Sequence, residues 1–301
     1  MTSYFGLSFV LLMALGFSAG GQVVTVHSDG MTRAELIPPS DPRFVPLRNK
    51  ILVRAGSNDA IEQYKNGSVI LKSNHSAHIV GYTMRWTVAP PAGDPIRFNK
   101  VYWNQSALDA SLDALIPKHQ PRIKAAHIGH VVRPGEARLV TPFFNVSADY
   151  SVAIYGLASS MFPQNFEAQF TTATAIDVTL DSAVYADGLC EGDDSLNLCS
   201  RINNELDGVR SVVSQVEELM KSGRDHALIL NDLAQSLGAI DVYDVPNTGA
   251  AHEEIVDVYR KRLIADALKV RDARGDEAAL SWVLEKSTTF SVHHKDPTAK
   301  R

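Results

Sequence analysis

The stretch "IVGYTMRWTV", residues 79–88, decides the fold class of this chain. Apolar side chains occupy every second position, and polar or small residues stand between them. The apolar positions are Val80, Tyr82, Met84, Trp86 and Val88. Because successive side chains of a strand point to opposite faces of a sheet, this alternation predicts a half-buried antiparallel strand.

Other short segments rich in β-branched and aromatic residues lie on both sides of this strand, with turn-forming residues between them. They are residues 50–56, 68–73, 98–104, 137–144, 149–156 and 174–188. Short strands at this spacing are typical of an antiparallel β-sandwich, which we expect to span residues 22–188. Two insertions interrupt it, and the first, at 106–118, has the leucine spacing of a short helix that stops at Pro117.

The second insertion carries a phenylalanine stripe, with Phe162, Phe166 and Phe170 four residues apart. This spacing places the three rings on one face of a short helix. The stripe is expected either to cover an open end of the sandwich or to line a pocket for a partner.

Beyond residue 189 the apolar period changes to between 3.5 and 3.6 residues, which is typical of helices. The longest seam consists of Ile202, Leu206, Val209, Val213, Val216 and Met220. Further helices are predicted at 226–237, 250–274 and around 277–286. The whole chain is therefore expected to be α+β, with a helical hairpin or small bundle at 189–292 and a frayed tail at 293–301. The seam of the helix at 196–220 either packs inside the chain or forms a homodimer.

The first 21 residues resemble a signal peptide, since an apolar stretch at 4–17 precedes the small residues Ala19 and Gly21. Cleavage after Gly21 would leave Gln22 at the mature end, and no membrane attachment is then expected. No lysine or arginine precedes the apolar stretch, so a retained membrane anchor and a misassigned start codon stay as alternatives.

Two stretches resemble uncharacterised secreted bacterial proteins. They are "KNGSVILKSNHSAHIVGYTMRWTV" at 65–88 and "VTLDSAVYADGLCEGDD" at 178–194. The resemblance implies an immunoglobulin-like sandwich that continues into a helical tail, and it implies no activity. The cysteine pair that bridges the two sheets of immunoglobulin domains is missing, because both cysteines follow the last predicted strand.

The two cysteines, Cys190 and Cys199, have eight residues between them. A catalytic dithiol normally has two intervening residues and uses a helix N-terminus to lower one thiol pKa. In an exported chain a single pair of cysteines favours a structural disulfide. We therefore predict a Cys190–Cys199 disulfide that links the sandwich covalently to its helical tail.

The same loop is rich in carboxylates, and calcium prefers oxygen ligands. The candidate ligands are Asp187, Glu191, Asp193 and Asp194. Their spacing differs from that of an EF-hand loop. Asp193, Asp194 and Ser195 also stand where N-terminal caps of the long helix belong, so capping is the alternative to calcium.

Other catalytic and ligand-binding patterns are weak. His127 and His130 lie three residues apart, near His119, but extended chain would direct that pair to opposite faces, which disfavours zinc. His252 begins a metalloprotease-like motif whose second histidine is replaced by Val256. No phosphate-binding loop, dinucleotide fingerprint or nucleophile elbow occurs.

The net charge of −5 offers no excess of basic residues for nucleic acid. These observations predict a secreted, non-enzymatic binding or structural module whose partner is a protein or an extracellular ligand. The alternative is a secreted hydrolase or metal-dependent enzyme, with Asp187, Glu191 or His127 gathered in a cleft of sandwich loops.

Overall fold

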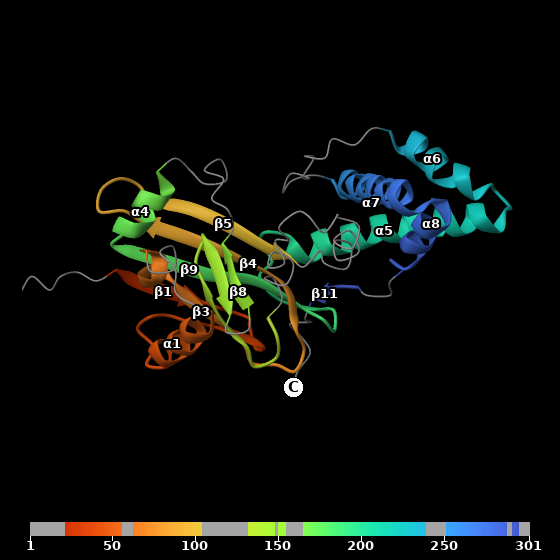
Figure 1. The fold of residues 1–301 in the computed structure, drawn as a ribbon. Helices are drawn as coiled ribbons and strands as arrows, with labels where there is room; N and C mark the ends of the chain where they lie inside the picture. Colours follow the sequence, from red (N-terminus) through yellow and green to blue (C-terminus); the bar gives the residue numbers. More distant parts are fainter. Residues whose placement is uncertain are drawn as a thin grey trace, which may run out of the picture.

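The computed structural model describes residues 22–55, 63–103, 132–147, 150–154, 165–238, 251–287 and 291–294. Within these ranges the protein is mixed α+β, with two sheets and six α-helices. Figure 1 shows the long helices gathered beyond one end of the sheets. The predicted helix at 106–118 lies outside the described residues.

The first sheet is centred on the long strand β9 and is mainly antiparallel. Its strands are β1 (Val23–His27), β4 (Ile79–Ala89), β5 (Ile96–Trp103), β9 (Ala175–Tyr185), β10 (Leu189–Gly192) and β11 (His293–His294). The hydrogen-bonded order is β11-β10-β9-β4-β5, and β1 also pairs with β9. Two pairings, β1 with β9 and β10 with β11, are parallel.

The second sheet is antiparallel throughout, with the order β2-β3-β6-β7-β8. Its strands are β2 (Ala34–Ile37), β3 (Val69–Ser73), β6 (Ala137–Val140), β7 (Phe144–Ser147) and β8 (Tyr150–Ile154). Polar contacts join it to the first sheet, since the Asn145 side-chain amide donates to the Tyr82 hydroxyl at 2.6 Å. Both sheets contribute to one apolar core.

The predicted core face of β4 is confirmed over most of its length. Tyr82, Met84, Trp86 and Val88 are fully buried in the shared core. A register irregularity between Ile79 and Gly81 changes the alternation at the start of the strand. As a result Ile79 enters this core, and Val80 packs instead against the cluster beside the helices.

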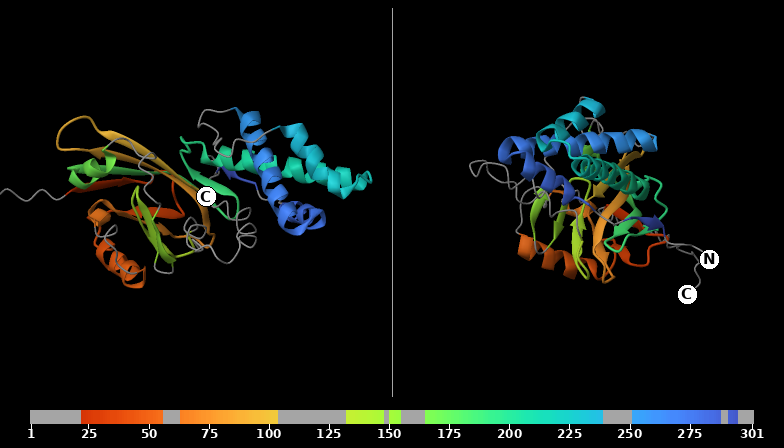
Figure 2. Two further views of the ribbon diagram at one scale, coloured as in Figure 1. Left: turned by 45° about the horizontal axis from the view of Figure 1, so that its top comes forward. Right: turned by 90° about the vertical axis from the view of Figure 1, so that its right-hand side faces the viewer.

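The predicted strand at 50–56 is wrong, because residues 50–55 belong to helix α1 (Phe44–Ala55). Phe44 and Ile51 are buried and lie seven residues apart, which is two turns of a helix, while Val45 and Val53 are exposed. Helix α1 packs against β3, β6, β7 and β8. In Figure 2 it covers the side of the second sheet that faces away from the first sheet.

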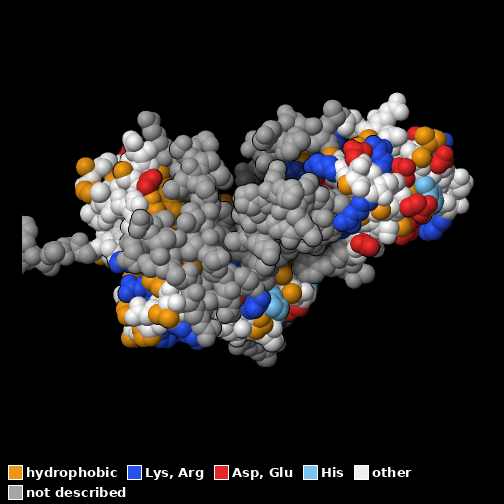
Figure 3. All heavy atoms as spheres, viewed as in Figure 1, with side chains coloured by type: hydrophobic (Ala, Val, Ile, Leu, Met, Phe, Trp, Pro, Cys, Tyr) orange, Lys and Arg blue, Asp and Glu red, His pale blue; other side chains and the backbone are white. Residues whose placement is uncertain are grey.

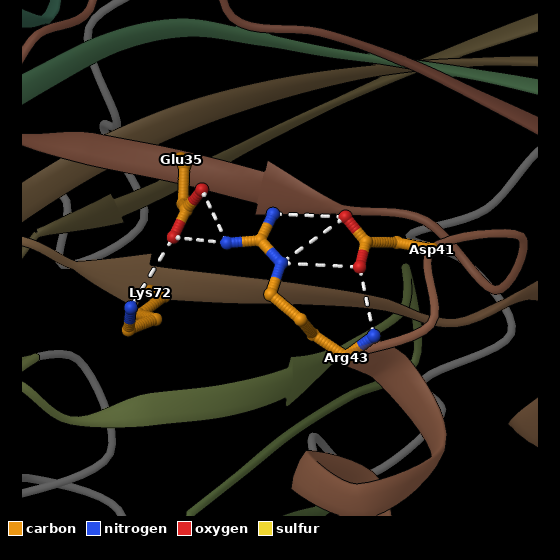
Figure 4. A network of polar contacts seen from close by, with 4 residues as sticks. All are labelled: Glu35, Asp41, Arg43 and Lys72. Carbon is orange, nitrogen blue, oxygen red and sulfur yellow. Dashed lines mark hydrogen bonds and ion pairs between the residues drawn. The ribbon is translucent and has the colours of Figure 1, made fainter.

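An ion-pair network fixes the entry into α1 (Figure 4). Arg43 contacts Asp41 at 2.8 Å and Glu35 of β2 at 3.2 Å, and Lys72 of β3 reaches the same glutamate at 3.3 Å. Burial acts to raise the pKa of Glu35, but hydrogen bonds from Asn74, Arg43 and Lys72 outweigh it and lower that pKa. The network ties the helix to the edge of the second sheet.

The helical part consists of α5 (Leu198–Lys221), α6 (His226–Leu237), α7 (His252–Arg274) and α8 (Asp276–Leu284). All four helices occupy the ranges expected from the apolar period. The seam of α5 packs inside the chain, and Val209, Val213 and Val216 share a core with residues of α6, α7 and α8. A homodimer through residues 196–220 would therefore have to use another face of α5.

The sheet and the helices are joined by a third, smaller cluster. It contains Val184, Cys190, Leu198, Cys199, Ile202 and Val292. Strand β10 continues the first sheet to Gly192, and the tail residues His293 and His294 return to pair with it as β11. We call this region, residues 187–203 with 291–294, the junction.

Candidate functional site

The predicted disulfide is confirmed and lies at the centre of the junction. Cys190 of β10 and Cys199 in the first turn of α5 are bonded, with their Cα atoms 6.4 Å apart. Both side chains are buried. Because β10 pairs with β9, the bridge links the first sheet directly to α5, the longest of the described helices.

Glu191 is fully buried and holds the turn that precedes β2. Its carboxylate accepts the backbone N–H groups of Thr32 and Arg33, each at 3.0 Å, and the Thr32 hydroxyl. The Tyr185 hydroxyl donates to it at 3.2 Å. Burial, together with this carboxylate, raises the pKa of Tyr185 well above its usual range.

Asp187 engages the same turn from a more exposed position. It pairs with the Arg33 guanidinium at 2.6 Å and accepts the Leu189 N–H at 3.2 Å. Partial burial acts to raise the pKa of Asp187, but these hydrogen bonds outweigh it and lower that pKa. The structure thus brings Asp187 and Glu191 together around residues 32–33, where cationic and N–H groups occupy them.

The other two carboxylates of the loop lie in different surroundings. Asp194 is buried and accepts the Cys199 N–H at 3.2 Å, so it caps the start of α5 as one of the predicted capping residues. Burial raises its pKa, and the backbone N–H groups of α5 only partly offset this. Asp193 is exposed. Asp187 and Glu191 contact the turn at residues 32–33, whereas Asp194 contacts the start of α5, and calcium binding at this loop stays a prediction.

A different set of potential ligands converges at the junction. The sulfur atoms of Cys190 and Cys199, a carboxylate oxygen of Asp194 and a ring nitrogen of His294 all lie within 4.8 Å of one another. The His294 Nε2 atom is 3.7 Å from the Asp194 carboxylate. Sequence reasoning missed His294, because it was assigned to a frayed tail about a hundred residues away along the chain.

Asp181 of β9 is a second residue that the sequence did not single out. Its side chain is fully buried and accepts hydrogen bonds from the Ser195 hydroxyl, the Leu196 N–H and the Thr83 hydroxyl. The Arg85 Nε atom lies 3.5 Å away. Asp181 therefore ties the turn before α5 to the centre of the sheet, and only its place in an alternating strand could have indicated it.

Lys100 of β5 is a perturbed ionisable group outside the junction. Its ammonium donates to the Pro142 carbonyl and lies 5.0 Å from the centre of the Tyr102 ring. Burial lowers the pKa of Lys100 to about 7. Because Pro142 lies between β6 and β7, this contact joins the two sheets and belongs to their packing.

The phenylalanine stripe contributes to the core. Phe166 and Phe170 project from α4 (Phe166–Thr172) and are buried. Their rings contact Phe143, with centroid distances of 5.7 and 5.2 Å. The two rings thus cover one end of the sheets, while Phe162 lies outside the described residues.

The predicted histidine sites are placed as follows. His119, His127 and His130 lie outside the described residues. His252 begins α7, and its ring nitrogen is 2.6 Å from the Asn204 side-chain oxygen of α5, so it joins two helices.

Comparison with known proteins finds no matching family model, no matching curated protein and no matching solved structure. The resemblance to secreted bacterial proteins therefore stays a prediction. Among the helices of the described ranges, none is both long enough and apolar enough to cross a membrane.

Proposed function

We propose that the protein is a non-enzymatic binding or structural module that works outside the cytoplasm. In this proposal an immunoglobulin-like sandwich and a helical bundle act as one unit. The observation that carries it is the construction of the junction, where a disulfide, buried carboxylates and a returning chain segment all hold α5 against the first sheet.

The disulfide, the hydrogen bonds and the strand pairing at the junction favour a module that holds its sheets and its helices in a constant relative orientation. The segment that leads into β11 is held by α5, since Asn203 donates to the Val292 carbonyl and accepts the Val292 N–H, both at 2.8 Å. A structural disulfide is typical of proteins in oxidising compartments, which supports export.

Two surfaces are suited to a partner. Strand β5 stands at one end of the described order of the first sheet, and Val101 on it is exposed, so an extended peptide could add to the sheet there. The helical part carries acidic and basic side chains interspersed over its surface (Figure 3). Leu228 of α6 is exposed on the helical part.

The first test is the intact mass of the protein isolated from its own source, with and without reduction. We expect a mass that corresponds to residues 22–301, two hydrogens lighter before reduction than after it. A retained N-terminal segment or two free thiols would contradict the proposed location.

The second test is site-specific photo-crosslinking in the source organism. A photoreactive residue replaces Val101 or Leu228, and Val53 on the exposed side of α1 is the control position. We expect a defined adduct from one of the first two positions, competed by unlabelled protein. Adducts of equal yield from Val53 would show that the crosslinking is nonspecific and would argue against a dedicated binding surface.

A further inference from the structure

The four convergent groups at the junction form a donor set that suits a transition metal. Cysteine sulfur, histidine nitrogen and aspartate oxygen are all zinc ligands, and structural zinc sites hold the ion with four protein ligands in a tetrahedral arrangement. The two sulfur atoms are at present joined to each other, so this donor set exists only when the disulfide is reduced.

Backbone contacts that do not involve the disulfide position the donors. In the pairing of β10 with β11, Cys190 lies opposite His294. Asp194 is held beside the first turn of α5 by the Cys199 N–H. Asn203 and the Gly188 carbonyl hold the segment that carries His294. We therefore expect the four groups to stay close together after the sulfur–sulfur bond is broken.

We propose that the junction is an exchangeable site that holds either the disulfide or one zinc ion, bound by Cys190, Cys199, Asp194 and His294. In the exchange, two molecules of a thiol reductant break the disulfide and are oxidised to their own disulfide, which leaves two cysteine thiols. Zinc then binds both sulfurs, and two protons are released. The inference does not depend on the proposed function.

The spacing of the two cysteines is compatible with both forms. Zinc–sulfur bonds of about 2.3 Å at a tetrahedral angle require the sulfur atoms to lie about 3.8 Å apart. The Cα–Cα distance of 6.4 Å is near the wide end of the range for disulfides, about 4.4–6.8 Å. Side-chain rotation can therefore supply the separation with little movement of the backbone.

Access to the site is through His294. The two cysteines and Asp194 are buried, whereas the His294 side chain is 57% exposed and belongs to a strand of only two residues. Local opening of such a short strand needs few contacts to break. A metal ion or a reductant can then reach the sulfur atoms from this side.

The test is zinc titration of the full chain in anaerobic buffer, after reduction with a phosphine that leaves no competing thiol. A chromophoric chelator reports the affinity. We expect one zinc per reduced chain with a Kd below about 0.1 µM, and no comparable binding by the oxidised chain. Cobalt in place of zinc should add thiolate-to-cobalt charge-transfer absorption, which reports sulfur ligation directly.

Adjacent histidines provide a matched pair of variants. His294→Ala should weaken zinc binding at least about tenfold, and Asp194→Asn should also weaken it. His293→Ala, on the same strand and also exposed, should bind as the wild type does. If the disulfide has only a structural role and the junction holds no zinc site, the two histidine variants should not differ in zinc affinity.

Three results would overturn the site. They are a reduced chain that takes up no stoichiometric zinc, equal affinities for the two histidine variants, and undiminished binding by a Cys190→Ala/Cys199→Ala chain. Circular dichroism of the reduced chain shows whether it stays folded without metal. If it stays folded and binds zinc, the backbone contacts position the donors as proposed. If it unfolds and zinc restores the fold, zinc binding at the site is still supported, because the metal then replaces the disulfide as the cross-link, but the backbone contacts alone do not hold the donors together.

Discussion

At the scale of single residues, the buried amine of Lys100 should make the stability of the protein depend on pH. Its folded-state pKa of about 7 lies below the usual value of 10.5. Between these values the unfolded chain binds a proton that the folded chain does not, so this residue makes stability rise with pH in that window. Below about pH 7 both states are protonated, and the cost of burying the charge is present in full.

Lys100→Met should therefore stabilise the protein at pH 6 more than at pH 10. We expect the difference in the free energy of unfolding between the variant and the wild type to change by about 2–4 kcal/mol between these pH values. Urea unfolding at pH 6, 8 and 10 measures it. Lys221→Met, at the exposed end of α5, controls for the loss of one positive charge. A stability difference that is the same at all three pH values would contradict the burial of a charged amine.

At the scale of elements, Gly208 shows how α5 and α7 pack. From the sequence this glycine only weakens the helix, because glycine has a low helix propensity. In the structure a Cβ atom at this position would lie 2.8 Å from the Val256 carbonyl oxygen and 2.9 Å from the Tyr259 Cβ atom. The absence of a side chain thus allows the backbone of α7 to approach α5 closely.

Gly208→Ala should destabilise the protein although alanine favours helix. The gain in propensity is about 1 kcal/mol, whereas overpacking against backbone costs about 1–3 kcal/mol, so we expect a net loss of up to about 2 kcal/mol. Thermal unfolding measures it. Ser214→Ala, on the exposed side of the same helix, should be neutral or slightly stabilising. A more stable Gly208→Ala protein would show that the two helices have room to separate.

The elements also show what could be predicted from the sequence. The sequence predicts helices α5 to α8 and strands β4 and β9 because each carries its own apolar period, and it predicts strands β3, β5, β6 and β8 from their β-branched and aromatic residues. The sequence predicts a strand where α1 lies, since a run such as "ILVR" fits either period when it is short. Strands β10 and β11 were missed, because each is short and forms only through pairing with another segment.

The residues of the junction also fall into those that the sequence predicts and those that it does not. Cys190 and Cys199 were predicted as a pair from their number and spacing. Asp181 and His294 were not, because their roles depend on contacts with residues that are far away along the chain or on another element. Local patterns report on local structure, and a site assembled from three segments has no such pattern.

At the scale of the whole molecule, the junction determines whether the sheets and the helices unfold together. The sheets share one core and the helices another, and the cluster around the disulfide joins them. If this cluster couples the two cores, the sheets and the helices should unfold together. The slowest amides of α7 and β4 should then exchange with similar opening free energies in the oxidised protein.

Replacing both cysteines by alanine, Cys190→Ala/Cys199→Ala, should weaken this coupling. The lost cross-link should cost about 2–3 kcal/mol, and amides of α6 to α8 should exchange faster than those of β4. Hydrogen exchange followed by mass spectrometry resolves the two sets of peptides. Leu71→Ala, in the core of the sheets with the junction intact, is the control, and should accelerate exchange in both parts together. If the cysteine variant also accelerates both parts equally, the helices are held by their other contacts with the sheet, and the disulfide adds stability without coupling the two cores.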